Sequence, residues 1–206
     1  LSQAIGNLTT GSVQPFDLGR VHVGPGSPAT GDPAGRPSES FTVACGTGFD
    51  ARLIAATTAE AKRRYGVAAY FMSAVRVREH LTPRPTIITI DGARSEIEAF
   101  VILIANCGEA IPGRLRPRLP MDPRDGLLHV FVLPRGGLVG GIRGAIELLT
   151  TDTLGTSRSG SAIRLTGRHV RVEVDPAQPT QVDGDTYPDG SLETWIRPGA
   201  LSVLVP

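Results

Sequence analysis

The sequence predicts an α+β domain that is mainly antiparallel β, built as a two-layer β-sandwich with covering helices. Short apolar runs recur at close spacing through the second half, separated by turn pairs such as Gly167-Arg168, Asp175-Pro176 and Asp183-Gly184. The chain also has 25 glycines and 17 prolines, many for a helical protein. Because its 206 residues are 40% hydrophobic, it can bury one sizeable core, and we expect a single domain over residues 1–206.

The first half is predicted to alternate short strands with helices. Residues 24–40 are rich in Gly, Pro, Ser and Thr and have almost no large apolar side chain, so we expect a flexible loop there. The helix predicted at 67–79 must stop before Pro83. In chain order the predicted elements are the end of a helix at 1–8, strands at 14–23 and 41–45, and helices at 51–65 and 67–79.

The clearest local prediction is a β-hairpin. The β-branched run 86–90 and the apolar run 98–105 flank Asp91-Gly92, which is a strong turn signal. A helix is predicted at 138–149 despite three glycines, each of which costs about 1 kcal/mol relative to alanine. The other predicted elements are strands at 127–133, 163–166, 170–174, 180–182, 192–196 and 201–205.

Charge and composition exclude several classes of function. The net charge is only +1 and no basic face is evident, so we expect no nucleic-acid partner. Lys62 is the only lysine, which leaves no P-loop lysine for phosphates. The longest apolar run, 100–105, is far shorter than the roughly 20 residues of a membrane helix. Cys45 and Cys107 are expected to be buried thiols, and we expect a cytoplasmic protein that meets membranes only peripherally.

Four apparent motifs have plainer readings. Gly46-x-Gly48-x-x-Ala51 resembles a dinucleotide-binding fingerprint, but a helix is predicted where the acid-ending second strand should follow, so we favour a tight strand-to-helix turn. The stretch 155–159 lacks the second glycine of a nucleophile elbow. The four histidines are too dispersed for zinc. The arginines between 114 and 124 could meet phosphates or anionic lipids, although a solvated loop is the simpler reading.

Two acidic turns remain as candidate sites. Asp125 lies in a Pro- and Gly-containing turn, where a carboxylate and free carbonyls could hold a hydrated hard cation. Asp183-Gly184-Asp185 is a second acidic turn, and Asp185 could serve as a general base if it projects toward a cleft. Each could also be only a turn.

Five stretches carry a resemblance to a known family. They are 16–21, 46–51, 125–130, 182–185 and 195–206, and together they resemble the C-terminal domain of the bacterial diacylglycerol kinase and sphingosine kinase superfamily. The resemblance implies an N-terminal nucleotide-binding domain with a Gly-Gly-Asp-Gly-Thr loop, which this sequence does not contain. It also implies a magnesium ion at Asp125 and a catalytic base at Asp185, where many members of the family have glutamate.

The expected function is therefore half of an ATP- and magnesium-dependent lipid kinase. Its acceptor would be a hydroxyl of diacylglycerol, a sphingoid base or a related lipid, and the isolated chain would be inactive because the ATP-binding residues lie in the missing domain. The expected partners are the lipid, that domain and a peripheral membrane surface, and a homodimer is left open. A catalytically silent lipid-binding or regulatory module and an NAD kinase relative are the alternatives.

Overall fold

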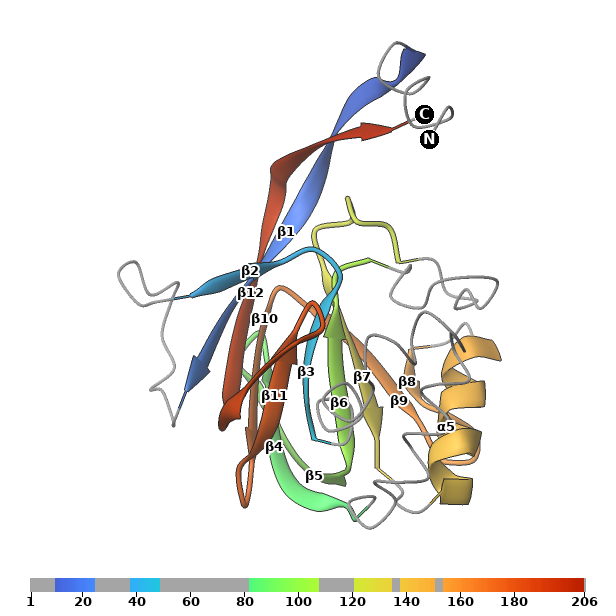
Figure 1. Ribbon diagram of the computed structural model, residues 1–206. Coiled ribbons are helices and arrows are strands. Elements are labelled where there is room, and N and C mark those ends of the chain that lie inside the picture. Colours follow the sequence, from blue (N-terminus) through green and yellow to red (C-terminus); the bar gives the residue numbers. More distant parts are fainter. Residues whose placement is uncertain are drawn as a thin grey trace, which may run out of the picture.

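The computed structural model describes residues 10–24, 38–48, 82–107, 121–134, 138–150 and 154–205. The predicted helices at 51–65 and 67–79, the helix end at 1–8 and most of the predicted loop lie outside these ranges. Within them the chain forms twelve strands and one helix (Figure 1). The strands are β1 (Ser12–Gly24), β2 (Glu39–Phe41), β3 (Ala44–Gly48), β4 (Arg84–Ile90), β5 (Ala93–Ala99), β6 (Val101–Ala105), β7 (Leu128–Leu133), β8 (Gly155–Thr156), β9 (Ile163–Gly167), β10 (His169–Val174), β11 (Gln178–Val182) and β12 (Asp185–Val205). The helix is α5 (Leu138–Thr150).

All described strand pairs are antiparallel, and they form two layers. The order β5-β4-β10-β12-β11-β3-β6-β7-β9-β8 is continuous, with β1 added beside β12 and β2 beside β1. The long strand β12 belongs to both layers: its first residues pair with β11, and its later residues pair with β10 and β1. The predicted antiparallel β-sandwich is thus confirmed.

The core lies between the two layers and follows from the alternation of side chains along each strand. In β10 and β12, Val170, Val172 and Leu192 are fully buried, whereas the intervening positions are polar. The largest fully buried aliphatic and aromatic side chains come from both layers: Val21, Phe41, Ile88, Ile102, Ile104, Leu128, Val130, Val132, Val170, Val172 and Leu192. Burying such side chains is the main favourable term in the stability of the fold.

The predicted hairpin forms, but its second strand differs from the prediction. β5 begins directly after the Asp91-Gly92 turn and pairs with β4 along its whole length. The chain then bends at Phe100, and β6 enters the other layer beside β3 and β7. The run 98–105 is therefore shared between two strands. An apolar run predicts that its residues are buried. Residues on both sides of the bend at Phe100 are buried, so the apolar pattern does not reveal where one strand ends and the next begins.

Other boundaries shift by a few residues. Gly24 ends β1 and Glu39 begins β2, so the predicted loop at 24–40 is framed by strands at both ends. The predicted strands 192–196 and 201–205 are parts of the single strand β12. Among the described residues, no helix combines the length and the apolar character needed to cross a bilayer.

Two strands extend beyond the sandwich as an arm. Residues 12–16 of β1 pair with residues 201–205 of β12, and Figure 1 shows this ribbon projecting from the body of the molecule. The register shifts between Phe16 and Leu18, so Asp17 is the residue at the bulge where the arm meets the sandwich.

Candidate functional site

The Asp183-Gly184 turn joins β11 to β12. Both residues have positive φ, 46° and 93°, and Val182 is paired with Asp185, which makes a two-residue hairpin turn with the twist that antiparallel strands prefer. Glycine is required here by the backbone rather than by space, because a Cβ on Gly184 would meet no atom within 4 Å. The predicted acidic turn is present.

The carboxylate of Asp183 is hydrogen-bonded to the segment that leads into β3. It accepts hydrogen bonds from the backbone nitrogens of Thr42, Val43 and Ala44 at 2.8, 3.0 and 2.9 Å, and from the Thr42 hydroxyl at 3.0 Å. In addition, the backbone nitrogen of Asp183 donates to the carbonyl of Ala44 at 2.8 Å. These hydrogen bonds use both carboxylate oxygens of Asp183. Asp183 is therefore an anchor for the turn.

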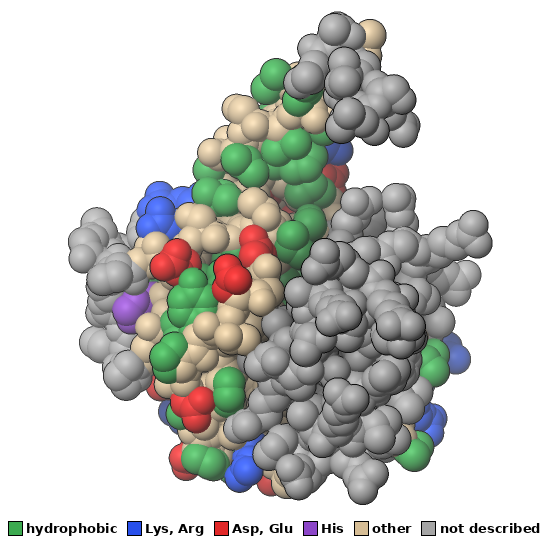
Figure 2. All heavy atoms as spheres, viewed as in Figure 1, with side chains coloured by type: hydrophobic (Ala, Val, Ile, Leu, Met, Phe, Trp, Pro, Cys, Tyr) green, Lys and Arg blue, Asp and Glu red, His purple; other side chains and the backbone are tan. Residues whose placement is uncertain are grey.

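Asp185 is the second carboxylate of the same turn and, like Asp183, it is exposed. It begins β12, two residues before Tyr187, whose ring packs against the core. Partial burial raises the pKa of Tyr187, and the negative charges of Glu39 and Asp185 raise it further. Figure 2 shows acidic side chains gathered on the visible face just below the arm. A substrate hydroxyl could thus approach Asp185 from solvent without displacing core side chains.

The Asp125 loop is organised by its own hydrogen bonds. Asp125 Oδ1 accepts from the backbone nitrogen of Leu127 at 2.9 Å, and Oδ2 lies 2.9 Å from Nε2 of the buried His129. Asp122 is held by Arg124, whose side-chain hydrogen bond keeps the pKa of Asp122 below its usual value. The Asp125 side chain is 27% exposed, so it remains open to solvent.

Asp17 connects this loop to the root of the arm. Its buried carboxylate accepts from the backbone nitrogen of Gly126 at 2.7 Å and from that of Gly199 at 2.8 Å. Its own backbone nitrogen donates to the carbonyl of Pro123 at 2.7 Å. Because a buried charge is costly unless it is hydrogen-bonded, these contacts explain how Asp17 can be 3% exposed. Asp17 thereby fixes the candidate metal loop.

Asn106 completes a connection between the two candidate loops. Its side-chain nitrogen donates to the carbonyls of Asp17 at 2.9 Å and Thr42 at 3.2 Å. A chain of hydrogen bonds therefore leads from Gly126 through Asp17, Asn106 and Thr42 to Asp183. The structure thus links the turns that carry Asp125 and Asp185.

Sequence reasoning missed these connecting residues, although signals were present. Asp17 is a lone acid within a strand of apolar and glycine neighbours, and Asn106 directly follows the apolar run of β6. A polar residue in such a position must find buried partners. The partners themselves, from 64 to 182 positions away, have no local signature.

The residues at Asp125 fit a hydrated magnesium ion. No group of three or more His, Cys, Asp or Glu side chains in the described ranges could hold a metal together. However, magnesium usually keeps several waters and binds proteins through one or two carboxylates. A carboxylate has about four lone-pair sites, and Asp125 uses one on each oxygen, which leaves acceptor capacity on its exposed side. The donor set is therefore suited to a hard, hydrated cation and not to zinc.

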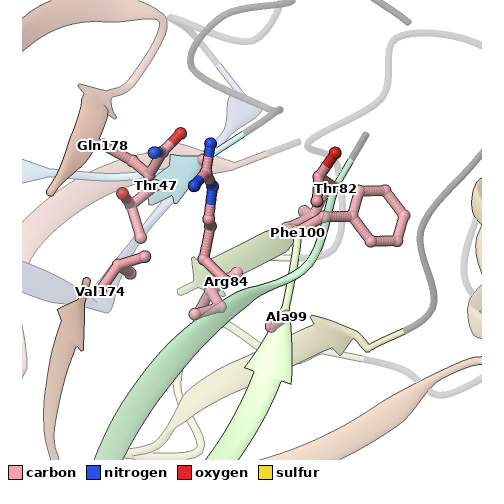
Figure 3. A pocket seen from close by; sticks show the side chains of 10 residues that line it. Thr47, Thr82, Arg84, Ala99, Phe100, Val174 and Gln178 are labelled. Atoms are coloured by element: carbon pink, nitrogen blue, oxygen red, sulfur yellow. The ribbon is translucent and has the colours of Figure 1, made fainter. Parts of the chain in front are cut away.

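A small pocket lies at the other end of β3 (Figure 3). Arg84 projects into it between Thr47 and Gln178 on one side and Thr82 and Phe100 on the other. The cavity volume of the pocket is about 10 Å³, which is room for about one water molecule and far less than the roughly 300–1,000 Å³ of typical ligand sites. Because Asp183 binds Ala44 at the opposite end of β3, this pocket is separate from the two linked turns.

Comparisons with known proteins agree with this fold. A candidate diacylglycerol kinase from Bacillus anthracis is 19% identical, with a TM-score of 0.68 over 98% of this chain and 60% of its own. A second solved structure, a diacylglycerol kinase from the same organism, is 15% identical, with a TM-score of 0.59 over 98% of this chain and 57% of its own. The uncharacterized protein sll0036 of Synechocystis is 25% identical over 162 residues, which are 78% of this chain and 37% of that protein. The chain thus spans about three fifths of these solved structures and less of the Synechocystis protein.

The sequence profile of one family matches residues 43–205, which is most of the chain. That family is described as the YegS C-terminal NAD kinase beta sandwich-like domain. The match covers β3 to β12, and so includes both linked turns. It confirms the resemblance to the C-terminal domain of the lipid kinase superfamily. The chain belongs to the family of YegS C-terminal NAD kinase beta sandwich-like domains.

Proposed function

We propose that the complete protein is an ATP- and magnesium-dependent kinase that phosphorylates a hydroxyl of diacylglycerol, a sphingoid base or a related lipid at the cytoplasmic membrane surface. A nucleotide-binding domain outside residues 1–206 would bind ATP. The solved structures named as diacylglycerol kinases support this class of acceptor, and they are longer than this chain.

The division of labour within one turn carries the proposal. Both aspartates are exposed, but the carboxylate of Asp183 accepts four hydrogen bonds from residues 42–44, and Asp185 takes no part in these bonds. Phosphoryl transfer requires little covalent help from the protein, which must position the hydroxyl, neutralise phosphate charge and accept one proton. Asp185 is the residue that we assign to accept the hydroxyl proton, and Asp183 positions it.

Asp125 is the residue that we assign to hold magnesium, with backbone oxygens and water completing the shell. When bound, the ion would supply positive charge against the phosphates. Asp17 would keep the loop in place through Gly126, and Asn106 would keep this loop and the Asp183 turn in a fixed relation.

Two alternatives differ in what the protein would phosphorylate, if anything. A relative of the NAD kinases would phosphorylate a nucleotide. The description of the matched family as NAD kinase beta sandwich-like supports this alternative. A silent lipid-binding or regulatory module would phosphorylate nothing, and aspartate rather than glutamate at position 185 is compatible with that.

The test is an acceptor screen with radiolabelled ATP and magnesium. We expect the complete protein to label diacylglycerol or a sphingoid base, and residues 1–206 alone to label neither, because they contain no glycine-rich phosphate loop. Labelling of NAD alone would favour the first alternative, and lipid binding without labelling would favour the second. Lipid phosphorylation by residues 1–206 would contradict the division of function between two domains.

A further inference from the structure

Tyr187 lies on the same face of strand β12 as Asp185. Side chains alternate along a strand, so residues two positions apart point to the same side. The pairing is regular here, with Val182 opposite Asp185 and Thr180 opposite Tyr187. Val182 and Thr180 are almost completely buried, and Val182 belongs to the core between the layers. The side chains of Asp185 and Tyr187 therefore project from the face of this layer that is turned toward the other layer.

Glu39 projects toward the same region from the other layer. It lies in β2, which is added beside β1, and it is paired with Val21. Val21 is fully buried in the core, so the side chain of Glu39 is also on an inward face. Partial burial raises the pKa of Tyr187, and the charges of Glu39 and Asp185 raise it further, so both carboxylates lie near the phenol. Both are nevertheless exposed, which places the three side chains at an open margin between the layers.

The hydroxyl of Tyr187 is an unused hydrogen-bond donor. Its ring packs against the core, while the hydroxyl forms no hydrogen bond with the residues that the structure describes. The raised pKa keeps the phenol protonated at neutral and mildly alkaline pH. Packing thus holds the ring in place, and the O–H group is available to a bound molecule.

A free donor beside a free carboxylate can hold a molecule that has two neighbouring oxygens. Residues two positions apart on a strand are about 7 Å apart, which the side chains of Asp185 and Tyr187 can span around one small polar group. In the proposed kinase, Asp185 accepts the proton of the reacting hydroxyl. Tyr187 can then donate to an oxygen on the adjacent carbon. Diacylglycerol has such an oxygen in the ester at its central carbon, whereas a simple long-chain alcohol has none.

We propose that Tyr187 is a specificity-determining residue, whose hydroxyl selects lipid acceptors that have an oxygen on the carbon next to the reacting hydroxyl. This inference rests on the proposed function, and it names the chemical feature by which the acceptor is recognised. The hydroxyl of Tyr187 touches the acceptor and takes no part in proton transfer. A site built around a donor disfavours a ligand that leaves this donor without a partner.

The test is calorimetric binding of two soluble acceptors to the complete protein, without nucleotide. The acceptors are dihexanoylglycerol, which has the adjacent oxygen, and octanol, which lacks it. Tyr187→Phe keeps the ring and removes only the hydroxyl. It should weaken the binding of dihexanoylglycerol about tenfold, the value of one hydrogen bond, and leave the binding of octanol unchanged. Because each acceptor is compared with itself, the difference in size between the two does not enter.

Thr186→Val is the matched control, because it also removes one hydroxyl from β12. Thr186 is exposed and is paired with Gln181, so it lies on the other face of the strand. The control should bind both acceptors as the unmodified protein does, and both variants should keep its melting temperature. Unchanged binding of dihexanoylglycerol by Tyr187→Phe would overturn the proposal. So would equal weakening for both acceptors, or binding of neither by the unmodified protein.

Two results separate this inference from the kinase proposal. Selective weakening of dihexanoylglycerol binding by Tyr187→Phe, with no lipid phosphorylated in the presence of ATP and magnesium, supports recognition by Tyr187 and contradicts the kinase. Phosphorylation of both acceptors, with the same ratio of KM values in Tyr187→Phe and in the unmodified protein, supports the kinase and contradicts selection by Tyr187.

Discussion

Two Asp-Gly hairpin turns, at Asp91-Gly92 and at Asp183-Gly184, have nearly the same backbone but different consequences. Their φ angles are 48° and 89° in the first turn and 46° and 93° in the second. In both, the aspartate carboxylate accepts backbone N–H groups from a distant segment, 168–169 for Asp91 and 42–44 for Asp183. In both, its own nitrogen donates to a carbonyl of that segment.

The difference lies in the residue that follows. Ala93 follows the first turn, whereas the exposed Asp185 follows the second. The Asp-Gly pair is therefore a structural device for joining strands to distant segments. A functional assignment therefore depends on the residue that follows the turn and on the side chains around it.

The largest effect is expected on turnover, and it distinguishes a chemical role of Asp185 from a structural role of its turn. In the complete protein, Asp185→Asn should lower turnover by about 10²–10⁴-fold with lipid binding little changed, because the proton acceptor is lost while the shape is kept. Asp185→Glu should retain substantial activity. Steady-state kinetics and melting curves measure both effects, and near-normal turnover of the Asn variant would end the assignment of Asp185 as base.

The next effect tests Asp17, the anchor between the metal loop and the arm. Asp17→Asn should destabilise the protein by about 2–4 kcal/mol, because an amide cannot accept from both Gly126 and Gly199 in that buried position. Chemical denaturation measures the loss. The control is Asp189→Asn at an exposed position, expected within about 0.5 kcal/mol of the unmodified protein. Equal stability of the two variants would show that Asp17 is not an anchor.

A smaller effect compares the two turns directly. Asp183→Ala should cost about 2–3 kcal/mol and Asp91→Ala about 1–2 kcal/mol, because Asp183 accepts from more donors. Only Asp183→Ala should also reduce lipid phosphorylation, since it releases the turn that presents Asp185. Denaturation curves together with turnover at a temperature where both variants are folded decide the point. Equal loss of activity in the two variants would contradict a positioning role for Asp183.

The smallest effect concerns the metal loop. Magnesium should raise the melting temperature of the unmodified protein but not of Asp125→Ala, since an ion that binds only the folded state stabilises it by mass action. With about tenfold more ion than its dissociation constant, the stabilisation is about 1.4 kcal/mol. Chelator should abolish the magnesium-dependent rise of the unmodified protein, and the loss of the hydrogen bonds to Leu127 and His129 should remain in Asp125→Ala. If Asp125→Ala lowers the melting temperature by the same amount with and without magnesium, Asp125 only shapes its turn.

The sequence was most informative where local chemistry determines the structure. The two Asp-Gly turns, the helix 138–149 and the strands β7, β9, β10 and β11 were predictable, because turn residues and β-branched runs act over a few positions. The predicted strands 192–196 and 201–205 proved to be parts of one long strand, β12. The corner at Phe100 was not predictable, since an apolar run does not reveal which layer it enters.

The candidate site was predictable only in part. Asp125 and Asp185 were recognised through their turns and a family resemblance. The roles of Asp17, Asn106 and Thr42 depend on backbone groups brought together by strand pairing over long sequence separations. Such contacts are decided by the tertiary fold, so a single sequence offers only the hint of a polar residue in an apolar setting.

The arm gives the domain a mechanical property. β12 is one strand of 21 residues with Asp185 at one end and Val205 at the tip of the arm, a contour of about 66 Å at roughly 3.3 Å per residue. A pull along the arm would load the β1–β12 hydrogen bonds in shear, so that they resist together rather than opening one after another. One hydrogen-bonded strand thus connects the tip of the arm to the turn that holds Asp185, and it passes from one layer of the sandwich to the other on the way.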